Sequence, residues 1–298
     1  MALRRVSYRL LRATCMQQGP TIRSLNSQTK ESDIHKPGQT HFGFQVVKEE
    51  EKVKKVHEVF ETVAEKYDLM NDVMSMGIHR LWKDMFMHRL APRHETRLLD
   101  MAGGTGDISF RYIKYLQSLG PPPPGARSSV TVCDINQNML DVGKARTRKL
   151  GLDTQAEQSG VEMSWLCANA EELTSIPDDE YTAYTIAFGI RNCTHIDKVL
   201  EEAYRVLAPG GRFLCLEFSQ LPNPTLQWVY DQYSFQVIPV LGHLFAGQWR
   251  PYQYLVESIR QFPDQEKFKS MIEDAGFRQV TYENLTFGTC AIHSGFKL

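Results

Sequence analysis

The sequence lacks the features that mark several classes of protein. No run reaches the ~18–20 apolar residues of a membrane-spanning helix, and the best candidate, residues 235–246, is short and contains Pro239 and His243. No C-x-x-C pair occurs, and no histidine lies at metal-ligand spacing from a cysteine. The 298 residues carry no basic excess, with 34 Lys and Arg against 35 Asp and Glu, which argues against a nucleic-acid-binding protein.

Cysteine is scattered along the chain rather than patterned. Cys133, Cys167 and Cys215 lie in apolar runs that look like strands. We therefore expect buried free thiols that pack as small hydrophobic residues, not disulfides or ligands, and we expect no bound metal.

Acidic residues are absent from the first 30 positions, which carry five arginines and Lys30. The rest of the chain keeps 28 basic and 35 acidic residues, so a leader of +6 precedes a body of −7. Leu3, Val6 and Leu10 stand at roughly helical spacing. This composition is typical of a mitochondrial transit peptide, whereas a secretory signal needs an uninterrupted apolar stretch. We expect residues 1–30 to be this leader, and a disordered basic tail is the alternative.

From residue 96 onward, strand-like and helix-like segments alternate. The predicted strands are 96–101, 129–134, 162–168, 183–188, 212–218, 279–285 and 289–296, and the predicted helices are 107–119, 138–150, 196–207 and 265–275. Strands that are apolar on both faces suit a parallel sheet covered by helices. The last two strands are joined across Gly288 and could pair as a hairpin. The pattern predicts an α/β fold with a mostly parallel sheet and an antiparallel C-terminal edge.

Two segments are additional to this alternation. Residues 45–90 read as helices, with valines from Val46 to Val63 on one apolar face. Residues 222–262 are rich in aromatic and apolar side chains, including Trp228 and Trp249. An apolar groove for a ligand and ordinary packing under a lid are equally good interpretations of the second segment.

The strongest local signal is a glycine cluster after the first predicted strand of the alternation, where residues 98–107 read LLDMAGGTGD. Glycines at a strand-to-helix turn permit positive φ and a close approach of the backbone to a ligand. Asp134 ends the next predicted strand, and a carboxylate there can accept both hydroxyls of a ribose. A tight turn without a ligand is the structural alternative.

The glycine spacing favours S-adenosylmethionine over NAD as the nucleotide. A G-x-G-x-x-G motif needs a third glycine, but Gly106 is followed by Asp107, Ile108 and Ser109. Asp107 would also oppose a pyrophosphate at the helix start, whereas a sulfonium cation tolerates nearby carboxylates. Asn169 and Ala170 follow the third predicted strand and could read an adenine edge, or Asn169 could cap a helix.

These motifs together resemble the ubiquinone/menaquinone biosynthesis C-methyltransferase family, within the class I S-adenosylmethionine-dependent methyltransferases. Residues 67–82 read YDLMNDVMSMGIHRLW and match the family's Y-D-x-[apolar]-N-x-x-[apolar]-S-x-x-x-H-x-x-W signature. Residues 100–107 (DMAGGTGD), 187–192 (AFGIRN) and 205–219 (RVLAPGGRFLCLEFS) match further motifs. The sequence departs from the family at Ala208, where lysine is usual, and at Ala187, where bacterial relatives have serine. The resemblance covers residues 41–298.

The resemblance implies a Rossmann-like methyltransferase domain at 41–298, with a helical cap at 45–90 and a substrate lid at 222–262. It implies cofactor contacts for S-adenosyl-L-methionine at Gly103, Thr105, Asp134, Asn169 and Ala170. It also implies that three residues, Tyr67, Arg191 and Asn192, line the substrate side. The implied reaction is C-methylation of a polyprenyl benzoquinol in ubiquinone biosynthesis, with no metal and no nucleic acid.

Each catalytic assignment has a structural alternative. We expect Arg191 to stabilise a phenolate whose ordinary pKa is near 10, but it could instead form an ion pair at a strand end. Tyr67 could be a packed aromatic residue. His79 and Trp82 stand three apart on a predicted helix, and we expect them to pack rather than react. Glu217 is a weaker candidate base.

The resemblance also implies partners and a location. We expect a matrix enzyme, peripheral on the matrix face of the mitochondrial inner membrane, within a multi-subunit coenzyme Q biosynthetic complex and with a homodimer as a further option. A body of −7 disfavours purely electrostatic attachment to anionic lipid. Two other functions stay open at this point: a methyltransferase for another small aromatic, and a non-catalytic scaffold that binds S-adenosylmethionine.

Overall fold

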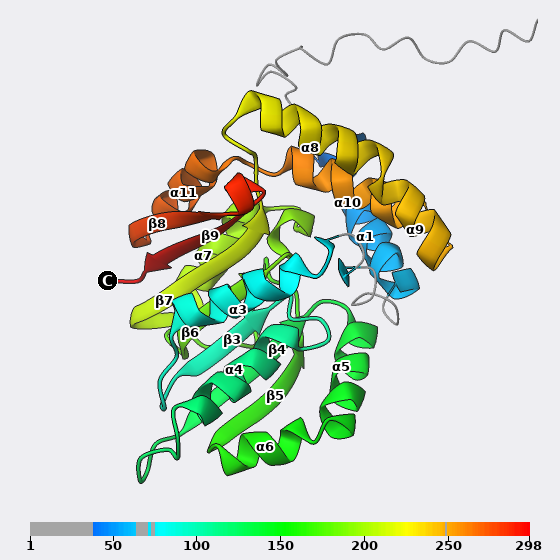
Figure 1. The fold of residues 1–298 in the computed structure, drawn as a ribbon. Coiled ribbons are helices and arrows are strands. Elements are labelled where there is room, and N and C mark those ends of the chain that lie inside the picture. Colours follow the sequence, from blue (N-terminus) through cyan, green and yellow to red (C-terminus); the bar gives the residue numbers. More distant parts are fainter. Residues whose placement is uncertain (1–37, 64–70, 73–74, 248) are drawn as a thin grey trace, which may run out of the picture. The chain divides into compact units, whose positions relative to one another are not determined.

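The structure is a computed structural model that describes residues 38–63, 71–72, 75–247 and 249–298. The predicted leader and Tyr67 therefore lie outside the described residues. Residues 38–298 form one compact unit, built around a seven-stranded sheet with strand order β5-β4-β3-β6-β7-β9-β8 (Figure 1). Its strands are β3 (Arg97–Met101), β4 (Ser128–Asp134), β5 (Val161–Cys167), β6 (Tyr181–Ala187), β7 (Leu207–Phe218), β8 (Arg278–Leu285) and β9 (Cys290–Phe296).

The sheet confirms the predicted fold class. β3 pairs in parallel with β4 and β6, and β6 pairs in parallel with β7. β9 pairs antiparallel with both β7 and β8, which gives the predicted antiparallel edge. Met101 lies opposite Cys133 and Ile186 in this register, so β3, β4 and β6 end at one level of the sheet and their following loops share one edge.

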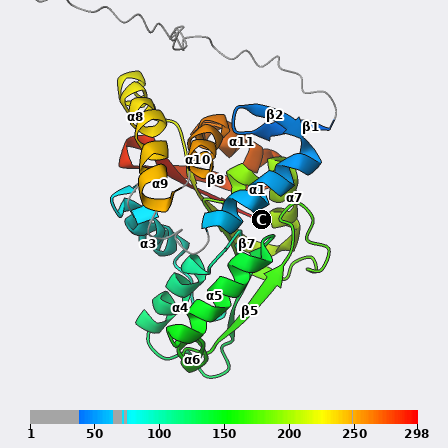
Figure 2. The ribbon, with the colours of Figure 1, turned by 90° about the vertical axis from the view of Figure 1, so that its right-hand side faces the viewer.

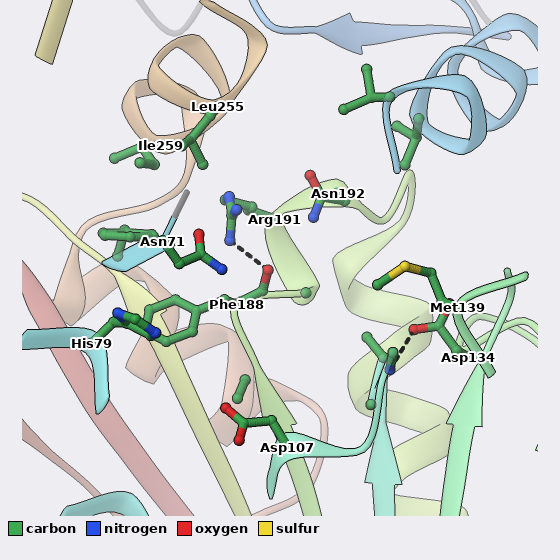
Figure 3. A pocket seen from close by; sticks show the side chains of 18 of the residues that line it. Asn71, His79, Asp107, Asp134, Met139, Phe188, Arg191, Asn192, Leu255 and Ile259 are labelled. Atoms are coloured by element: carbon green, nitrogen blue, oxygen red, sulfur yellow. Dashed lines mark hydrogen bonds between the residues drawn. The ribbon is translucent and has the colours of Figure 1, made fainter. Parts of the chain in front are cut away.

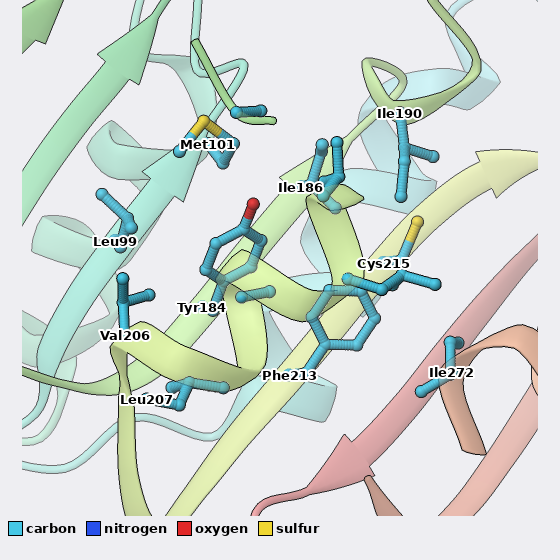
Figure 4. Close-up of a cluster of buried hydrophobic side chains, with 14 of the residues drawn as sticks. Leu99, Met101, Tyr184, Ile186, Ile190, Val206, Leu207, Phe213, Cys215 and Ile272 are labelled. Atoms are coloured by element: carbon cyan, nitrogen blue, oxygen red, sulfur yellow. The ribbon is translucent and has the colours of Figure 1, made fainter. Parts of the chain in front are cut away.

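Helices cover both faces of the sheet. α3 (Ile78–Leu90) and α4 (Asp107–Ser118) pack on one face, and α7 (Ile196–Val206) and α11 (Gln265–Asp274) on the other. Because side chains alternate along a strand, β3 contributes to the hydrophobic clusters on both faces of the sheet. Leu98 belongs to the first cluster, which packs against α3 and α4, and Leu99 belongs to the second cluster, which packs against α7 and α11. Figure 4 shows the second cluster, in which β3, β6, β7 and α7 meet. α5 (Gln137–Lys149) and the short α6 (Leu152–Gln158), which we did not predict, flank β4 and β5.

The start of the predicted helical cap is a hairpin, not a helix. β1 (Gln39–Phe42) pairs antiparallel with β2 (Gln45–Lys48) across Gly43, which has a φ of 57°, as a two-residue turn requires. Phe42 stacks on Tyr254 with ring centroids 4.2 Å apart. α1 (Glu49–Val63) begins only after this hairpin, and Val46 lies in β2 with an exposed side chain. The helical prediction for residues 45–48 was therefore wrong.

The aromatic segment forms three helices, α8 (Pro224–Gln236), α9 (Ile238–Ala246) and α10 (Arg250–Gln261). They lie with α1 beyond the ends of β3, β4 and β6, which Figure 1 labels, and Figure 2 shows the same helices from the side. α9 and α10 approach each other closely at Gly242, which lacks a Cβ. A Cβ at this position would lie only 2.0 Å from the ring of Tyr252. No helix in the described part of the chain is both long enough and apolar enough to cross a membrane.

The cysteines of the described segments, Cys133, Cys167, Cys193, Cys215 and Cys290, are all free thiols. Cys133 and Cys215 are buried, as predicted. Cys167 is exposed instead, because β5 is the edge strand at its end of the sheet and only one of its sides is paired.

Candidate active site

The loop between β3 and α4 is shaped by positive backbone angles. Ala102, Gly104 and Gly106 have φ values of 50°, 53° and 85°, so the chain turns sharply before α4 begins at Asp107. A Cβ on Gly103 would lie 2.8 Å from Val132 Cγ1 and 2.9 Å from the Asp100 carbonyl oxygen. Position 103 therefore accepts only glycine in this conformation.

A buried carboxylate holds this loop in place. Asp100 Oδ2 accepts hydrogen bonds from Ser109 Oγ at 2.7 Å and from the Ser109 N–H at 3.1 Å. Asp100 Oδ1 accepts a third from Thr185 Oγ1 at 3.1 Å. Burial raises the pKa of Asp100 to about 6, although these three donors favour its ionised form. The carboxylate thus joins β3, the first turn of α4 and β6.

Asp134 stands at the end of β4, beside the glycine loop. Its Oδ2 accepts the Gly104 N–H and its Oδ1 accepts the Asn136 N–H, each at 2.9 Å. Each carboxylate oxygen keeps a further lone pair for a ligand hydroxyl. Burial raises the pKa of this carboxyl group above its ordinary value. The geometry thus places a hydrogen-bond acceptor on the cavity wall, at the residue for which the sequence predicts contact with a ribose.

Asn169 does not cap a helix. Its Oδ1 accepts the Glu171 N–H at 3.1 Å, and no helix begins in the turns and bends that follow it. Ala170 is buried beside it. The helix-cap alternative was therefore wrong, because the side chain closes a local turn of the kind that asparagine favours.

A cavity of about 820 Å³ joins the predicted residues. Its wall includes the seven predicted site residues that the structure describes, namely Gly103, Thr105, Asp134, Asn169, Ala170, Arg191 and Asn192. Figure 3 shows Asp134, Arg191 and Asn192 among them. α1 contributes Val53 and Val56, and α10 contributes Leu255 and Ile259. This volume lies within the range of small-molecule sites in proteins. The cavity runs from the glycine loop to the apolar helices of the aromatic segment.

Arg191 lies between these two ends, in the 3₁₀ turn η2 (Ile190–Asn192). Its Nη1 donates to Glu217 Oε1 at 2.8 Å and to the Phe188 carbonyl oxygen at 2.6 Å. The guanidinium also lies over the Phe218 ring, 5.4 Å from its centroid. The structural alternative, an ion pair at a strand end, is therefore present, but Arg191 lines the cavity as well. Glu217 is 1% exposed and its pKa is raised by burial, so it serves to hold Arg191.

Asn192 is fixed from the lid. Its Oδ1 accepts a hydrogen bond from Tyr254 of α10 at 3.0 Å. Burial raises the pKa of Tyr254 well above its ordinary value, so this hydroxyl keeps its proton and remains a donor. With the Asn192 oxygen engaged, the amide nitrogen is the group left for a ligand.

The family signature places more residues on the cavity wall than we predicted. Asn71, Ser75 and His79 line it, four positions apart in sequence, and that spacing was the signal we did not use. Trp82 is buried at 4% exposure and donates through Nε1 to Thr286 Oγ1 at 2.9 Å, as a packing residue does. His79 and Trp82 both line the cavity as well, and the expectation that they pack rather than react stays a prediction.

Asp107, at the cavity floor, belongs to an ion-pair network. Lys83 Nζ lies 2.7 Å from Asp107 Oδ2, and Arg111 pairs with Oδ1 of the same carboxylate. Burial favours the neutral acid, but the two cations outweigh it and hold the pKa of Asp107 below its ordinary value. A negative charge is therefore fixed at the start of α4.

A family model described as the ubiE/COQ5 methyltransferase family matches residues 45–297. The chain belongs to this family. It is accordingly a methyltransferase that depends on S-adenosylmethionine, and the match bears out the family resemblance of the four motifs.

Three ubiE/COQ5 relatives share more than half of their aligned residues with the chain, and each is named 2-methoxy-6-polyprenyl-1,4-benzoquinol methylase, mitochondrial. The protein of Drosophila melanogaster is 66% identical over 90% of this chain and 88% of its own length. The human protein is 54% identical over 90% and 87%, and that of Dictyostelium discoideum is 53% identical over 93% and 92%.

A solved structure shares the fold of this ubiE/COQ5 member. It is described as a SAM-dependent methyltransferase, possible histamine N-methyltransferase, from Thermotoga maritima. It is 16% identical, has a TM-score of 0.52 and covers 81% of this chain and 99% of its own. At that identity the likeness shows the class I methyltransferase fold alone.

The buried Asp100 carboxyl group predicts a specific pH dependence of the free energy of unfolding. With a pKa of about 6 when folded against 3.8 ordinarily, the folded state retains a proton that the unfolded state loses between those values. Stability from this group therefore falls as the pH rises from about 4 to 6, by roughly 3 kcal/mol. Asp100→Asn removes this dependence, so the free energy of unfolding of wild type relative to the variant declines over that range in denaturant titrations.

The matched control for this measurement is Asp141→Asn, which changes an exposed carboxylate on α5. Its difference from wild type should be flat between pH 4 and 7. A flat difference for Asp100→Asn as well would show that Asp100 is not protonated in the folded protein near pH 5.

Proposed function

We propose that the chain transfers a methyl group from S-adenosylmethionine to a ring carbon of 2-methoxy-6-polyprenyl-1,4-benzoquinol, in ubiquinone biosynthesis. The observation that carries this proposal is the continuity of the cavity. One end has a glycine loop and two carboxylates, the middle has Arg191 and Asn192, and the other end is walled by Leu255 and Ile259. These three regions suit a nucleoside cation, a phenolic ring and an apolar tail, in that order.

The donor end fits S-adenosylmethionine through charge and shape. Asp134 offers the free lone pairs of its two oxygens to ribose hydroxyls, since its backbone donors use only one position on each. Asp107 is paired with Lys83 and Arg111, so the preference for a sulfonium cation over a pyrophosphate rests on the Asp134 carboxylate. Gly103 and Thr105 form the backbone floor, and Asn169 with Ala170 flank the adenine. When bound, S-adenosylmethionine supplies the electrophilic methyl group.

Arg191 activates the acceptor ring in this proposal. A neutral ring carbon is a poor nucleophile, whereas a phenolate places electron density on the ortho carbon. Forming a phenolate near pH 7 from a phenol of pKa near 10 costs roughly 4 kcal/mol. A positioned cation in a site shielded from water can offset a cost of that size. The Asn192 amide nitrogen donates to the same oxygen, and Tyr67 remains a proposed contact for the substrate.

The polyprenyl tail occupies the lid in this proposal. A polyprenyl chain has no polar group, so it requires an apolar groove, and the wall between α1 and α10 is of that kind. Tyr230, Tyr233 and Ile238 extend this wall along α8 and α9.

We also propose a mitochondrial location, with residues 1–30 as the transit peptide and the matrix face of the inner membrane as the working site. The basic leader and the names of the relatives support the organelle. Trp228 and Leu244 on the lid are 63% and 70% exposed, which suits contact with a lipid surface or with subunits of a coenzyme Q biosynthetic complex. A homodimer would bury the same kind of surface.

Substitution of the ribose acceptor tests the donor end. Asp134→Asn should weaken S-adenosylmethionine binding by about 10- to 100-fold, because hydrogen bonds to a charged acceptor contribute roughly 1.5–3 kcal/mol each. Isothermal titration calorimetry measures this directly. Asp141→Asn on the neighbouring helix is the control and should bind normally. Equal affinities of the two variants would refute the assignment.

A series of quinols with and without prenyl units tests the substrate. We expect kcat/KM to rise by more than about 10-fold with the first isoprene unit, since each buried methylene contributes roughly 0.8 kcal/mol. Leu255→Ala in the cavity wall should reduce this advantage, whereas Leu226→Ala, an exposed lid position, should preserve it. Equal rates with unprenylated quinol would favour a methyltransferase for another small aromatic.

The role of Arg191 is best tested by substitutions that take account of its ion-pair partner, Glu217. Arg191→Ala alone would strand the buried Glu217 charge, at a cost of about 3–5 kcal/mol, so loss of activity could reflect unfolding. Arg191→Lys keeps a cation opposite Glu217, and Arg191→Gln with Glu217→Gln removes both charges of the pair together. We expect both variants to bind S-adenosylmethionine, with the double variant at least about 100-fold slower in methyl transfer. Equal rates would exclude Arg191 from the chemistry.

A further inference from the structure

His79 occupies a position on the cavity wall that the proposed chemistry does not yet use. It lies near the start of α3, and Figure 3 shows its ring beside Phe188 and near Asn71, on the side of the cavity proposed for the substrate. The residue is 7% exposed. A polar ring at such a place must have each of its nitrogens accounted for.

Hydrogen counting fixes the tautomer of this histidine. Ser75 Oγ lies 2.6 Å from the Asn71 carbonyl oxygen, which can only accept, so the single hydroxyl hydrogen of Ser75 is committed there. Ser75 Oγ also lies 2.8 Å from His79 Nδ1. In that second contact the serine oxygen must accept, and Nδ1 must carry the hydrogen. Neutral His79 therefore has a bare lone pair on Nε2.

The surroundings keep His79 neutral. Burial lowers its pKa to about 4, and the nearby Lys83 cation acts in the same direction. Asp72 Oδ1 lies 3.8 Å from Nε2, beyond hydrogen-bond distance, and as a carboxylate it has no proton to donate. Within the described part of the chain, no donor reaches Nε2. The cavity thus presents an acceptor on one side and the donors Arg191 and Asn192 on the other.

We propose that His79 Nε2 accepts a hydrogen bond from a hydroxyl of the bound quinol and thereby selects the reduced substrate over its quinone. This inference rests on the proposed function. A benzoquinol carries two hydroxyls, of which one faces Arg191 as the incipient phenolate and the other stays protonated. The protonated one needs an acceptor. A quinone carbonyl in the same place would set lone pair against lone pair.

The difference between the pKa values of a phenol and of His79 indicates that His79 is a hydrogen-bond acceptor and not the general base. Transfer of a proton from a phenol of pKa near 10 to an imidazole of pKa about 4 is unfavourable by about six pKa units. A hydrogen bond without transfer has no such cost. His79 thus orients the ring and favours binding of the quinol over the quinone, while the phenolate forms at Arg191.

The test compares dissociation constants for a short-chain prenyl benzoquinol, kept reduced under argon, and for its quinone. Wild type should prefer the quinol by about 10-fold or more, because an unsatisfied buried polar group costs roughly 1–3 kcal/mol. In His79→Asn the amide can still donate to Ser75 but nothing replaces Nε2. Quinol affinity should therefore fall, and the preference should drop to within about threefold.

His79→Gln is the matched variant, because its amide reaches the place of Nε2 and can present either oxygen or nitrogen. It should recover quinol binding and also admit the quinone, a pattern that loss of a packing contact would not produce. S-adenosylmethionine affinity serves as the folding control for both variants. An unchanged quinol preference in His79→Asn would overturn the proposal.

Methyl transfer by wild type, measured with the same quinol, separates the two proposals. Discrimination between quinol and quinone without any methyl transfer would refute the proposed activity and leave His79 as the acceptor. Methyl transfer with equal binding of quinol and quinone would support the activity and exclude the role of His79.

Discussion

The carboxylate of Asp100 joins three elements, and the geometry of the cavity depends on that junction. Its bonds to Ser109 and Thr185 tie β3 to the start of α4 and to β6. The two loops that leave β3 and β6 also touch, since a Cβ on Gly189 would lie 2.4 Å from the Cβ of Ala102. A shift of the glycine loop would therefore move the segment that carries Arg191. The donor end and the acceptor end of the cavity are held at a fixed separation, as proximity between two reactants requires.

Charge divides the same cavity. Asp134 places a negative charge at the glycine loop, where Asp107 is paired with Lys83 and Arg111. Arg191 places a positive charge in the middle, balanced by the buried Glu217. His79 adds a neutral ring nitrogen, because burial and Lys83 disfavour its cation. In the proposed function, the sulfonium, the phenolate and the protonated hydroxyl thus each meet a complementary group. The low polarity of the lid strengthens these interactions by keeping water away.

The sequence predicted the sheet well because each central strand is apolar on both faces and each following helix has a clear stop. It also predicted which residues gather at the sheet edge, since parallel strands end together. It misread residues 45–48, because the hairpin depends on Gly43 and on the stacking of Phe42 on Tyr254, more than 200 residues away. The role proposed for His79 could not be predicted from the sequence for a related reason. It depends on the tautomer of His79, which Ser75 determines through a hydrogen already committed to the Asn71 carbonyl oxygen.

α10 connects the apolar and polar halves of the cavity. Leu255 and Ile259 form part of the apolar wall, and Tyr254 on the same helix fixes the amide of Asn192. Phe42 holds Tyr254 from the other side. Since a helix moves as a unit, a displacement that alters the apolar wall also disturbs the hydrogen bond that aims Asn192 at the ring. In the proposed function, an apolar tail lodged against α10 therefore stabilises the arrangement of donors that the phenolate needs, and binding far from the reacting carbon lowers the barrier there.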